Sequence, residues 1–459
     1  METFAVCGFA TILILILSWP AFKYFFSGET FTYVRILNLH GGNLWEAAFS
    51  RMDGMFFRPG FLLSDLGWHV ILPANPMFYH IRNVIFCAIS LILLHRVLLK
   101  FVRSRQARIA ALSLVAASKM YLTIIGYINV YEASILLITI LSTVLFWFRY
   151  IKTRRTSDYL LTLLLCTLSA YSKDNGFVVI GILAAMVVAL AIEPGNVRKQ
   201  IRYWGLRFAP LAIISLSYLV LRYVLTGPIN PNNPVYSPRL SFGVAVWQAK
   251  AFFATVGNFS LTNAGSMGER GLSGVLAGNS RAVELGLCVA LWLLILLTLW
   301  QARASWRLLI VPVVWIGLYL FPLFLIRNHQ VYYHQDPLVG LALLIGIGLD
   351  RASRRLMMTW YVVIALIAIN AFISNRRSYY DWEYVADRAE IVRPIVASLK
   401  DNPPKSIVFV TSPQQLGFWA FTIGGPLVPQ LLGSPDTSVK VVDSASSLSP
   451  DAFVYRLPD

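Results

Sequence analysis

Long apolar runs separated by short polar links recur along most of the 459 residues. Each run has roughly 18–22 residues, and a helix of that length crosses about 30 Å of hydrocarbon. Backbone polar groups inside a bilayer must bond to one another, and runs of this length satisfy that requirement as helices. The pattern predicts an all-α polytopic membrane protein with about eleven spans. Their expected bounds are 3–22, 77–98, 109–127, 132–149, 158–172, 175–192, 208–226, 284–301, 307–326, 335–349 and 356–374.

The composition excludes a water-soluble globule. The chain is 57% hydrophobic and only 13% charged, and its mean hydropathy is +0.64. Ordinary soluble domains carry roughly twice that charged fraction. The four cysteines lie in apolar runs without metal-ligand spacing, so they are interpreted as small buried side chains. No basic region or cleavage site precedes Lys23, and we expect the first run to be a retained span.

The basic residues indicate the orientation. The net charge is +17, and the basic side chains concentrate in every second link. Cytoplasmic loops are rich in Lys and Arg, so these links are predicted to be cytoplasmic. The N-terminus then lies in the cytoplasm and the C-terminus outside, as in a bacterial inner-membrane protein. No basic stripe with interleaved aromatic residues forms a groove, so nucleic-acid binding is not expected.

Three segments are then large enough to work outside the membrane: the loops at 23–76 and 227–283 and the tail at 374–459. We predict a transmembrane domain over 1–373 and a small non-cytoplasmic α/β domain over 374–459. The tail contains a helical stretch, Trp382–Leu399, an apolar run, Ser406–Thr411, and later strand-like runs. In the first loop, Asn43–Met52 is predicted to form a helix that either lies in the membrane interface or packs within the loop.

Acidic residues are scarce, and a carboxylate beside lipid is costly unless it is paired or solvated. Four of them stand at predicted outer positions: Glu29, Asp53, Glu132 and Asp174. Each alone is typical of a solvated loop residue. Their convergence on one face favours a functional site.

Basic and polar residues are predicted on the same face: Arg35, Arg58, His80, Arg82, Asn83, Lys173, Arg327, His329, Tyr332, Tyr333 and His334. Outward cations oppose the usual charge bias, and a phosphate-bearing ligand would account for them. The alternative is that they form structural ion pairs with acids such as Asp65 and Asp174. His80 and Asn83 share one helical face, where they either touch substrate or fix the outer loop.

Several chemistries lack a sequence motif. The chain has no Walker sequence, no dinucleotide-binding glycine motif and no G-x-S-x-G. His329, His334 and Asp336 are metal-ligating residue types, but their spacing matches no strong ligand motif. No cofactor is therefore predicted, and a divalent metal has no motif to support it.

Three strings resemble motifs of one family. These are Phe56–Gly60 followed by Asn75–Asn83, the Ser172–Asn175 turn, and the stretch from Tyr127 to Glu132. They are similar to the GT-C glycosyltransferase superfamily, particularly its protein O-mannosyltransferase-like members. The motif resemblance covers about the first 190 residues, and the layout of the remainder agrees with it.

The resemblance implies transfer of a sugar from a polyprenyl-phosphate carrier to a protein, lipid or glycan acceptor at the non-cytoplasmic face. An acidic residue of the first outer loop usually acts as base or positions the acceptor. The family often has an acidic pair after the first span, whereas this chain has a lone Glu29, with Asp53 as the other candidate. Either residue is the candidate base. Together with the charge pattern, the predicted substrate-binding residues are Arg58, His80, Asn83, Lys173, Asp174, Arg327 and Tyr332.

Direct displacement by one base predicts inversion at the anomeric carbon. Arg58, Lys173 and Arg327 would then stabilise the leaving phosphate. Two other interpretations stay open. The chain could be a membrane transporter or lipid flippase with the same charges lining a pathway, or a non-catalytic subunit with a GT-C-like fold.

Overall fold

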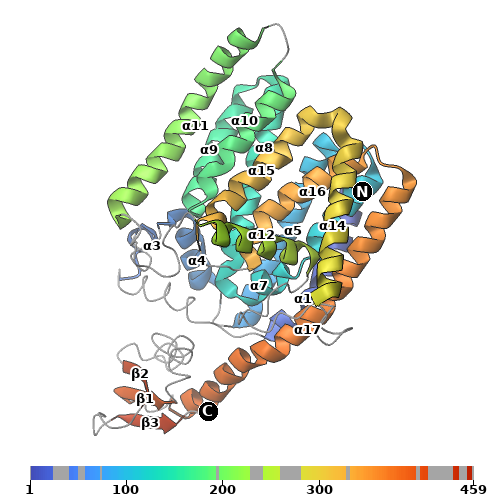
Figure 1. The fold of residues 1–459 in the computed structure, drawn as a ribbon. Helices are drawn as coiled ribbons and strands as arrows, with labels where there is room; N and C mark the ends of the chain where they lie inside the picture. Colours follow the sequence, from blue (N-terminus) through green and yellow to red (C-terminus); the bar gives the residue numbers. More distant parts are fainter. Residues whose placement is uncertain are drawn as a thin grey trace.

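The computed structural model describes residues 2–23, 41–49, 57–72, 75–192, 196–227, 241–258, 281–326, 331–399, 404–411, 438–443 and 452–456. Most of these residues form a bundle of helices, and a small sheet stands apart from the bundle at the end of the last helix (Figure 1). This arrangement confirms the predicted helical class and the presence of strands near the C-terminus.

The α-helices differ widely in length. In chain order they are α1 (Glu2–Ser18), α3 (Leu44–Ala48), α4 (Pro59–Ile71), α5 (Pro76–Phe101), α6 (Arg105–Ala116), α7 (Met120–Gly126), α8 (Glu132–Thr153), α9 (Thr156–Ser172), α10 (Val179–Leu190), α11 (Val197–Thr226), α12 (Phe242–Gly257), α14 (Arg281–Gln301), α15 (Trp306–Phe324), α16 (Gln335–Leu349) and α17 (Arg354–Leu399). Short 3-10 turns are η1 (Trp19–Lys23), η2 (Ile128–Tyr131), η3 (Gly176–Val178), η4 (Ala302–Ser305) and η5 (Val331–His334).

Within the described ranges, six helices are long and apolar enough to cross a membrane. They are Glu2–Phe22, Pro76–Phe101, Glu132–Thr153, Val197–Thr226, Trp306–Phe324 and Arg354–Ile373, and a bent pair of helices adds a seventh candidate. The apolar helices Gly176–Leu190 and Val289–Gln301 are shorter. A multi-pass helical membrane protein is therefore confirmed, whereas the predicted number of eleven spans stays a prediction.

Helix α16 forms the centre of the bundle. Each of its residues, from Gln335 to Leu349, is buried, and α15, α14, α6 and α5 pack around it. Glycines make this close packing possible, since a Cβ added at Gly340 would meet the Trp315 ring at 3.1 Å. Helix α11 differs because only 17% of its apolar stretch is buried in the protein, as expected for a helix that faces lipid.

The run predicted as a single span at 109–127 is broken. Helices α6 and α7 meet at an angle of 59°. Asn258, which follows α12, fills the break. Its amide accepts from the Lys119 N–H at 2.8 Å and donates to the Ala117 carbonyl at 2.8 Å. These bonds satisfy backbone groups that a continuous helix would have paired internally.

Two predicted helices of the C-terminal region are one. Helix α17 continues from Arg354 to Leu399 without the expected interruption after residue 374. Beyond it, β1 (Ser406–Val410) pairs in parallel with β2 (Ser438–Val442) and β3 (Phe453–Arg456), in the order β2-β1-β3. The apolar run predicted from Ser406 is thus the central strand, and three of its five residues are buried.

The helix predicted at 43–52 is the short α3, and residues 50–52 lie outside the described ranges. The Asn43 side chain caps it by accepting from the Trp45 and Glu46 amides. Ala47 and Ala48 pack against α4, whereas Trp45 is 63% exposed. One face of α3 therefore packs in the protein, and its aromatic face is exposed.

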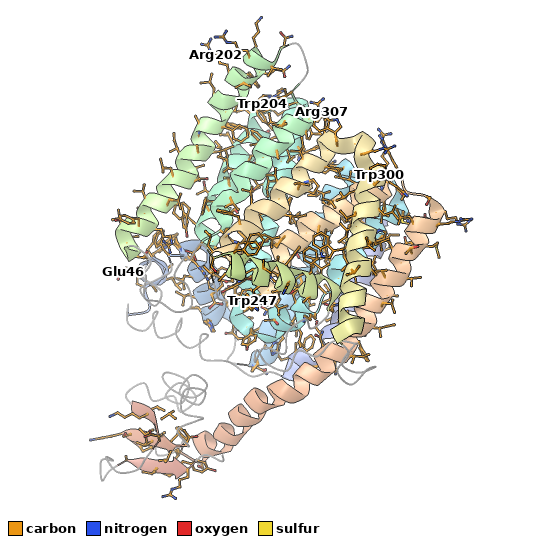
Figure 2. The ribbon with its side chains drawn as sticks, in the orientation of Figure 1. Glu46, Arg202, Trp204, Trp247, Trp300 and Arg307 are labelled. Carbon is orange, nitrogen blue, oxygen red and sulfur yellow. The ribbon has the colours of Figure 1, made fainter. Side chains whose placement is uncertain are left out.

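The two ends of the bundle carry different residues. Figure 2 shows Arg202 and Arg307 at the end opposite to Glu46. The sequence places the two arginines in cytoplasmic links and Glu46 in the first outer loop. The predicted cytoplasmic links and the predicted outer loop thus lie at opposite ends of the bundle, as the alternation of cytoplasmic and outer segments along the chain requires. Which end faces the cytoplasm stays a prediction.

Candidate functional site

Five charged residues meet at the end of the bundle where α4, α8, α9 and α11 come together. Arg58 precedes α4, Glu132 begins α8, Lys173 and Asp174 follow α9, and Arg222 lies near the carboxyl end of α11. We call these five residues the charged cluster. Three cations face two carboxylates, so the cluster has one positive charge in excess at neutral pH.

Glu132 joins two of the cations. Its Oε2 lies 2.7 Å from Arg58 Nη1, and its Oε1 lies 3.1 Å from Lys173 Nζ. The three side chains are only 6%, 13% and 9% exposed, respectively. Such pairs are screened weakly because little water reaches them. Glu132 therefore fixes the positions of both cations relative to each other.

Asp174 forms the second half of the cluster. Its Oδ2 lies 2.7 Å from Arg58 Nε, and its Oδ1 lies 3.2 Å from Arg222 Nε. The Tyr218 hydroxyl donates to Oδ1 at 3.1 Å. Burial alone would raise the pKa of the Asp174 carboxyl, but the Arg58 and Arg222 guanidinium groups outweigh it and hold that pKa below its ordinary value. Asp174 is therefore a stable anion that orients two arginines.

The turn that carries Lys173 and Asp174 depends on a glycine. A Cβ at Gly176 would lie 1.8 Å from the Ser169 carbonyl oxygen, so only glycine allows the chain to fold back so tightly after α9. The Ser169 hydroxyl donates to the Gly176 carbonyl and closes the turn. The glycine thereby places the Ser172–Asn175 turn between the end of α9 and the start of η3.

Lys173 also contacts aromatic rings. Its Nζ lies 5.0 Å from the centroid of the Tyr332 ring and 5.6 Å from that of Tyr333. Both tyrosines belong to η5, which leads directly into the central helix α16. These distances are typical of cation–π contacts. The contact connects the charged cluster to the amino-terminal end of α16.

His80 and Asn83 contact the main chain of a neighbouring segment. His80 Nδ1 lies 2.7 Å from the Ile125 carbonyl, and Asn83 Nδ2 donates to the Ile124 carbonyl at 2.9 Å. Both side chains are fully buried. The two side chains thus hold the end of α7 against α5. Their predicted roles, contact with substrate or fixing of the outer loop, stay predictions.

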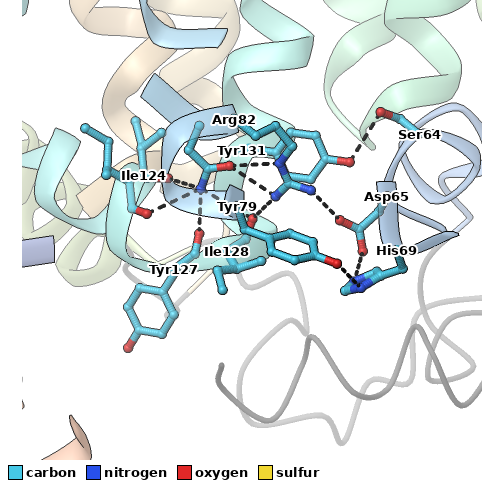
Figure 3. Close-up of polar contacts among 11 residues, drawn as sticks. Ser64, Asp65, His69, Tyr79, Arg82, Ile124, Tyr127, Ile128 and Tyr131 are labelled. Carbon is cyan, nitrogen blue, oxygen red and sulfur yellow. Dashed lines mark hydrogen bonds and ion pairs between the residues drawn. The ribbon is translucent and has the colours of Figure 1, made fainter. Parts of the chain in front are cut away.

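Arg82, beside them, anchors α4 (Figure 3). Its guanidinium lies 3.6 Å from the centroid of the Tyr131 ring and 3.4 Å from the buried Asp65 carboxylate. His69 Nε2 lies 3.5 Å from the same carboxylate, and its Nδ1 lies 3.0 Å from the Tyr79 hydroxyl. The network connects α4, α5 and η2, and so it supports the helix that begins directly after Arg58.

Some predicted site residues lie outside the described ranges. They are Glu29, Arg35, Asp53, Arg327 and His329. Arg58, Lys173, Asp174 and Tyr332 are described and lie together, whereas His80 and Asn83 belong to the buried network around Arg82. Sequence reasoning missed Arg222 and Tyr218. A lone arginine near the predicted outer end of the 208–226 run was the signal that could have indicated Arg222.

No group of three or more His, Cys, Asp or Glu side chains within the described part of the chain could hold a metal ion. His334, one of the three metal-type residues, is buried, and its Nδ1 lies 2.8 Å from Thr255 Oγ1.

Solved structures share this architecture. ArnT from Cupriavidus metallidurans, solved with bound undecaprenyl phosphate, superimposes with a TM-score of 0.54 at 10% identity, over 97% of this chain and 87% of that one. The oligosaccharyltransferase of Archaeoglobus fulgidus in its apo form gives a TM-score of 0.51 at 13% identity. The match covers 95% of this chain and 64% of the oligosaccharyltransferase.

The same oligosaccharyltransferase, tethered to an acceptor peptide with the NVT sequon, gives a TM-score of 0.50 at 12% identity, over 95% of this chain and 63% of that one. No protein-family model matches the sequence, and no curated protein matches it. The likeness therefore lies in the fold. Over nearly its whole length, the chain shares the fold of ArnT and of the oligosaccharyltransferase.

Proposed function

We propose that the protein transfers a sugar from a polyprenyl-phosphate carrier to an acceptor at the non-cytoplasmic face of the membrane. The acceptor is a protein, a lipid or a glycan. ArnT was solved with undecaprenyl phosphate and the oligosaccharyltransferase with an acceptor peptide, which supports a lipid-linked donor and an acceptor of this general kind. The shared fold supports this transfer chemistry, and the charged cluster supports the location of the proposed site.

The observation that carries the proposal is the charged cluster beside the first large loop. Arg58 follows Asp53 by five residues in the sequence. A fully extended chain of that length spans at most about 18 Å, which is the greatest separation that the covalent chain allows between Asp53 and Arg58. The excess positive charge of the cluster favours an anionic group there, and a lipid phosphate supplies one.

In the proposed reaction, the acceptor hydroxyl attacks the anomeric carbon, and a new C–O bond forms there. The bond between the anomeric carbon and the phosphate oxygen breaks, and polyprenyl phosphate leaves with the bonding electrons. Asp53 or Glu29 accepts the hydroxyl proton, a contribution of roughly 10²–10⁴-fold. A single displacement inverts the anomeric centre.

The cations act on the leaving group. Arg58, Lys173 and Arg327 are proposed to stabilise the charge that grows on the phosphate. Glu132 and Asp174 hold Arg58 and Lys173 in fixed positions, so these cations do not have to reorganise during the reaction. Tyr332, which contacts Lys173, would lie against the donor, and His80 and Asn83 are proposed to bind substrate from the adjoining network.

The proposed topology follows from the charge pattern. The N-terminus is cytoplasmic, and residues 374–459 form a non-cytoplasmic domain attached to the transmembrane domain at 1–373. The protein would then be a multi-pass protein of a bacterial inner membrane. The charged cluster lies at the same end as Glu46, which that topology places outside the cytoplasm.

Separate Asp53→Asn and Glu29→Gln variants test the catalytic assignment. Transfer from undecaprenyl-phosphate mannose, glucose and galactose is measured with purified protein and candidate acceptors. We expect one of the two variants to lose at least about 100-fold in rate, since it lacks the proton acceptor. Glu46→Gln is the matched control, because Glu46 is an exposed carboxylate of the same loop that bonds to Asn43. Parental rates in both test variants would refute the assignment.

One feature favours transport as a second candidate function. Transporters have broken helices and ionisable residues at membrane depth. Helices α6 and α7 form such a break, and Lys119 at the break is 5% exposed. The same labelled donors added to sealed vesicles distinguish the two functions: uptake without product indicates a transporter or flippase. Binding with neither uptake nor product indicates a non-catalytic subunit.

A further inference from the structure

Three buried polar side chains near the amino-terminal end of α16 have unused hydrogen-bonding capacity. Gln335 is 0% exposed, and neither its Nε2 nor its Oε1 has a partner in the described part of the chain. Within the same part, Asp336 Oδ1 and the Tyr319 hydroxyl are also unpartnered, and these residues are 5% and 1% exposed. We call Gln335, Asp336 and Tyr319 the inner polar group.

The inner polar group lies next to the charged cluster. Asp336 interacts electrostatically with both Lys173 and Tyr319, so the carboxylate is near each of them. Tyr332 and Tyr333, a few residues earlier, contact Lys173 through their rings. A ligand whose phosphate is held at Lys173 would therefore present the group attached to that phosphate towards the start of α16.

Polar groups in a protein interior are ordinarily hydrogen-bonded, because desolvation without a partner is unfavourable. The neighbouring His334 forms one such bond, between its Nδ1 and Thr255 Oγ1. Helix α16 is otherwise apolar and could have begun with apolar residues at the same positions. Gln335 and Asp336 follow one another at the start of α16, and Asp336 lies near both Tyr319 and Lys173. These buried exceptions beside a charged site indicate that a bound molecule completes their hydrogen bonds.

We propose that the inner polar group binds the hydroxyl groups of the sugar carried by the lipid phosphate. The proposal rests on the proposed function and names the subsite that would select its donor. A sugar hydroxyl both donates and accepts, which matches an amide that offers one acceptor and two donors. The Asp336 carboxylate accepts from a hydroxyl, and Tyr319 can donate or accept.

The test compares ligands with and without a sugar. Binding of undecaprenyl phosphate and of undecaprenyl-phosphate mannose, glucose and galactose is measured on the purified full-length protein. The parent should bind at least one glycosylated lipid about tenfold or more tightly than the bare phosphate. Gln335→Met should remove about tenfold of that preference and leave the affinity for the bare phosphate unchanged. Asp336→Asn should also remove about tenfold of the preference, although the loss of a negative charge near Lys173 should tighten the binding of both lipids.

Thermal stability separates recognition from a structural role. Replacing an unpartnered buried amide with an apolar side chain of similar size should leave the melting temperature of the ligand-free Gln335→Met protein unchanged or raised. Gln248→Leu is the matched control, because Gln248 is also buried but donates to the Ile326 carbonyl at 2.9 Å. It should lower the melting temperature and keep the preference for glycosylated lipid.

Other outcomes overturn either this proposal or the proposed function. An unchanged preference in Gln335→Met and Asp336→Asn would mean that water alone satisfies these groups. An equal loss for glycosylated and bare lipid would assign them to the scaffold or to the phosphate. If the parent prefers the glycosylated lipid but transfers no sugar, the subsite is retained and the proposed function is refuted. If the parent transfers sugar without preferring the glycosylated lipid, the proposed function is retained and the subsite is refuted.

Discussion

Glu132 connects distant segments of the chain, because its single carboxylate contacts two cations from different segments. Arg58 precedes α4 and Lys173 follows α9, so Glu132 connects three parts of the chain. The sequence marked Glu132 as an acid beside a span and assigned it no role in the site. The structure makes it the residue that sets the separation of the two predicted phosphate-binding cations.

Glu132→Gln should therefore be strongly destabilising. It removes the charge that both Arg58 and Lys173 face at a site where all three side chains are mostly buried. Breaking a buried pair typically costs about 3–5 kcal/mol, and we expect a loss of unfolding free energy in this range. Chemical denaturation in detergent measures it.

Arg149→Ala is the matched comparison. Arg149 lies 3.2 Å from Asp158 but is itself 52% exposed. We expect a loss of about 1 kcal/mol or less, because solvent screens an exposed partner. Equal losses in the two variants would show that the Glu132 pairs contribute no more than a surface contact.

At the scale of the elements, the broken α6–α7 helix determines how α12 and α17 meet the bundle. Asn258 donates to the Ile367 carbonyl of α17 as well as bonding to both sides of the break. Its backbone is left-handed, with φ of 55°. Asparagine is among the few residues that adopt this conformation readily and can also form the three bonds.

Two substitutions of Asn258 separate the contribution of its side-chain hydrogen bonds from that of its left-handed backbone conformation. Asn258→Gly keeps the backbone conformation and removes the side-chain bonds, so it should lose at least about 2 kcal/mol of unfolding free energy. Asn258→Ala should lose about 1 kcal/mol more, because alanine is strained at positive φ. Thermal and chemical unfolding in detergent measure both.

Asn43→Gly serves as the control, since Asn43 caps the exposed end of α3. Only a few tenths of a kcal/mol should be lost there. The assignment of Asn258 as the support of the break is wrong if its glycine variant is as stable as the Asn43 variant.

The continuous helix α17 has a consequence at the same scale. It extends away from the bundle in the direction of the small sheet and ends at Leu399, and β1 begins at Ser406 (Figure 1). The sequence predicted an end near residue 374 because the apolar residues end there. Hydropathy reports where lipid ends, and a helix can continue beyond that point with polar side chains.

For the whole molecule, the predicted sidedness can be tested with single cysteines in a variant that lacks the native ones. Glu46→Cys should react with a membrane-impermeant maleimide added outside intact cells, because Glu46 lies in the first outer loop. Lys152→Cys should react only after permeabilisation, since it lies in a predicted cytoplasmic link. The reverse pattern of labelling would invert the topology and place the charged cluster in the cytoplasm.

The sequence by itself determined the class of the protein, because the length and apolarity of the runs leave few alternatives in a bilayer. It also predicted that Arg58, Lys173 and Asp174 lie on one face, since charges beside lipid are costly and therefore informative. It did not predict the break at Lys119. The backbone groups that the break leaves without helical partners bond to Asn258, and Asn258 lies far away in the sequence.

Only the tertiary structure decided how the charges pair and which polar groups lack partners. Arg222 and Tyr218 reach Asp174 because α11 packs beside α9, and no local pattern records that packing. The inner polar group emerged in the same way, since Gln335 and Asp336 look like an ordinary helix start in the sequence. Pairing and burial depend on contacts between distant segments, whereas hydropathy is a local property of the chain.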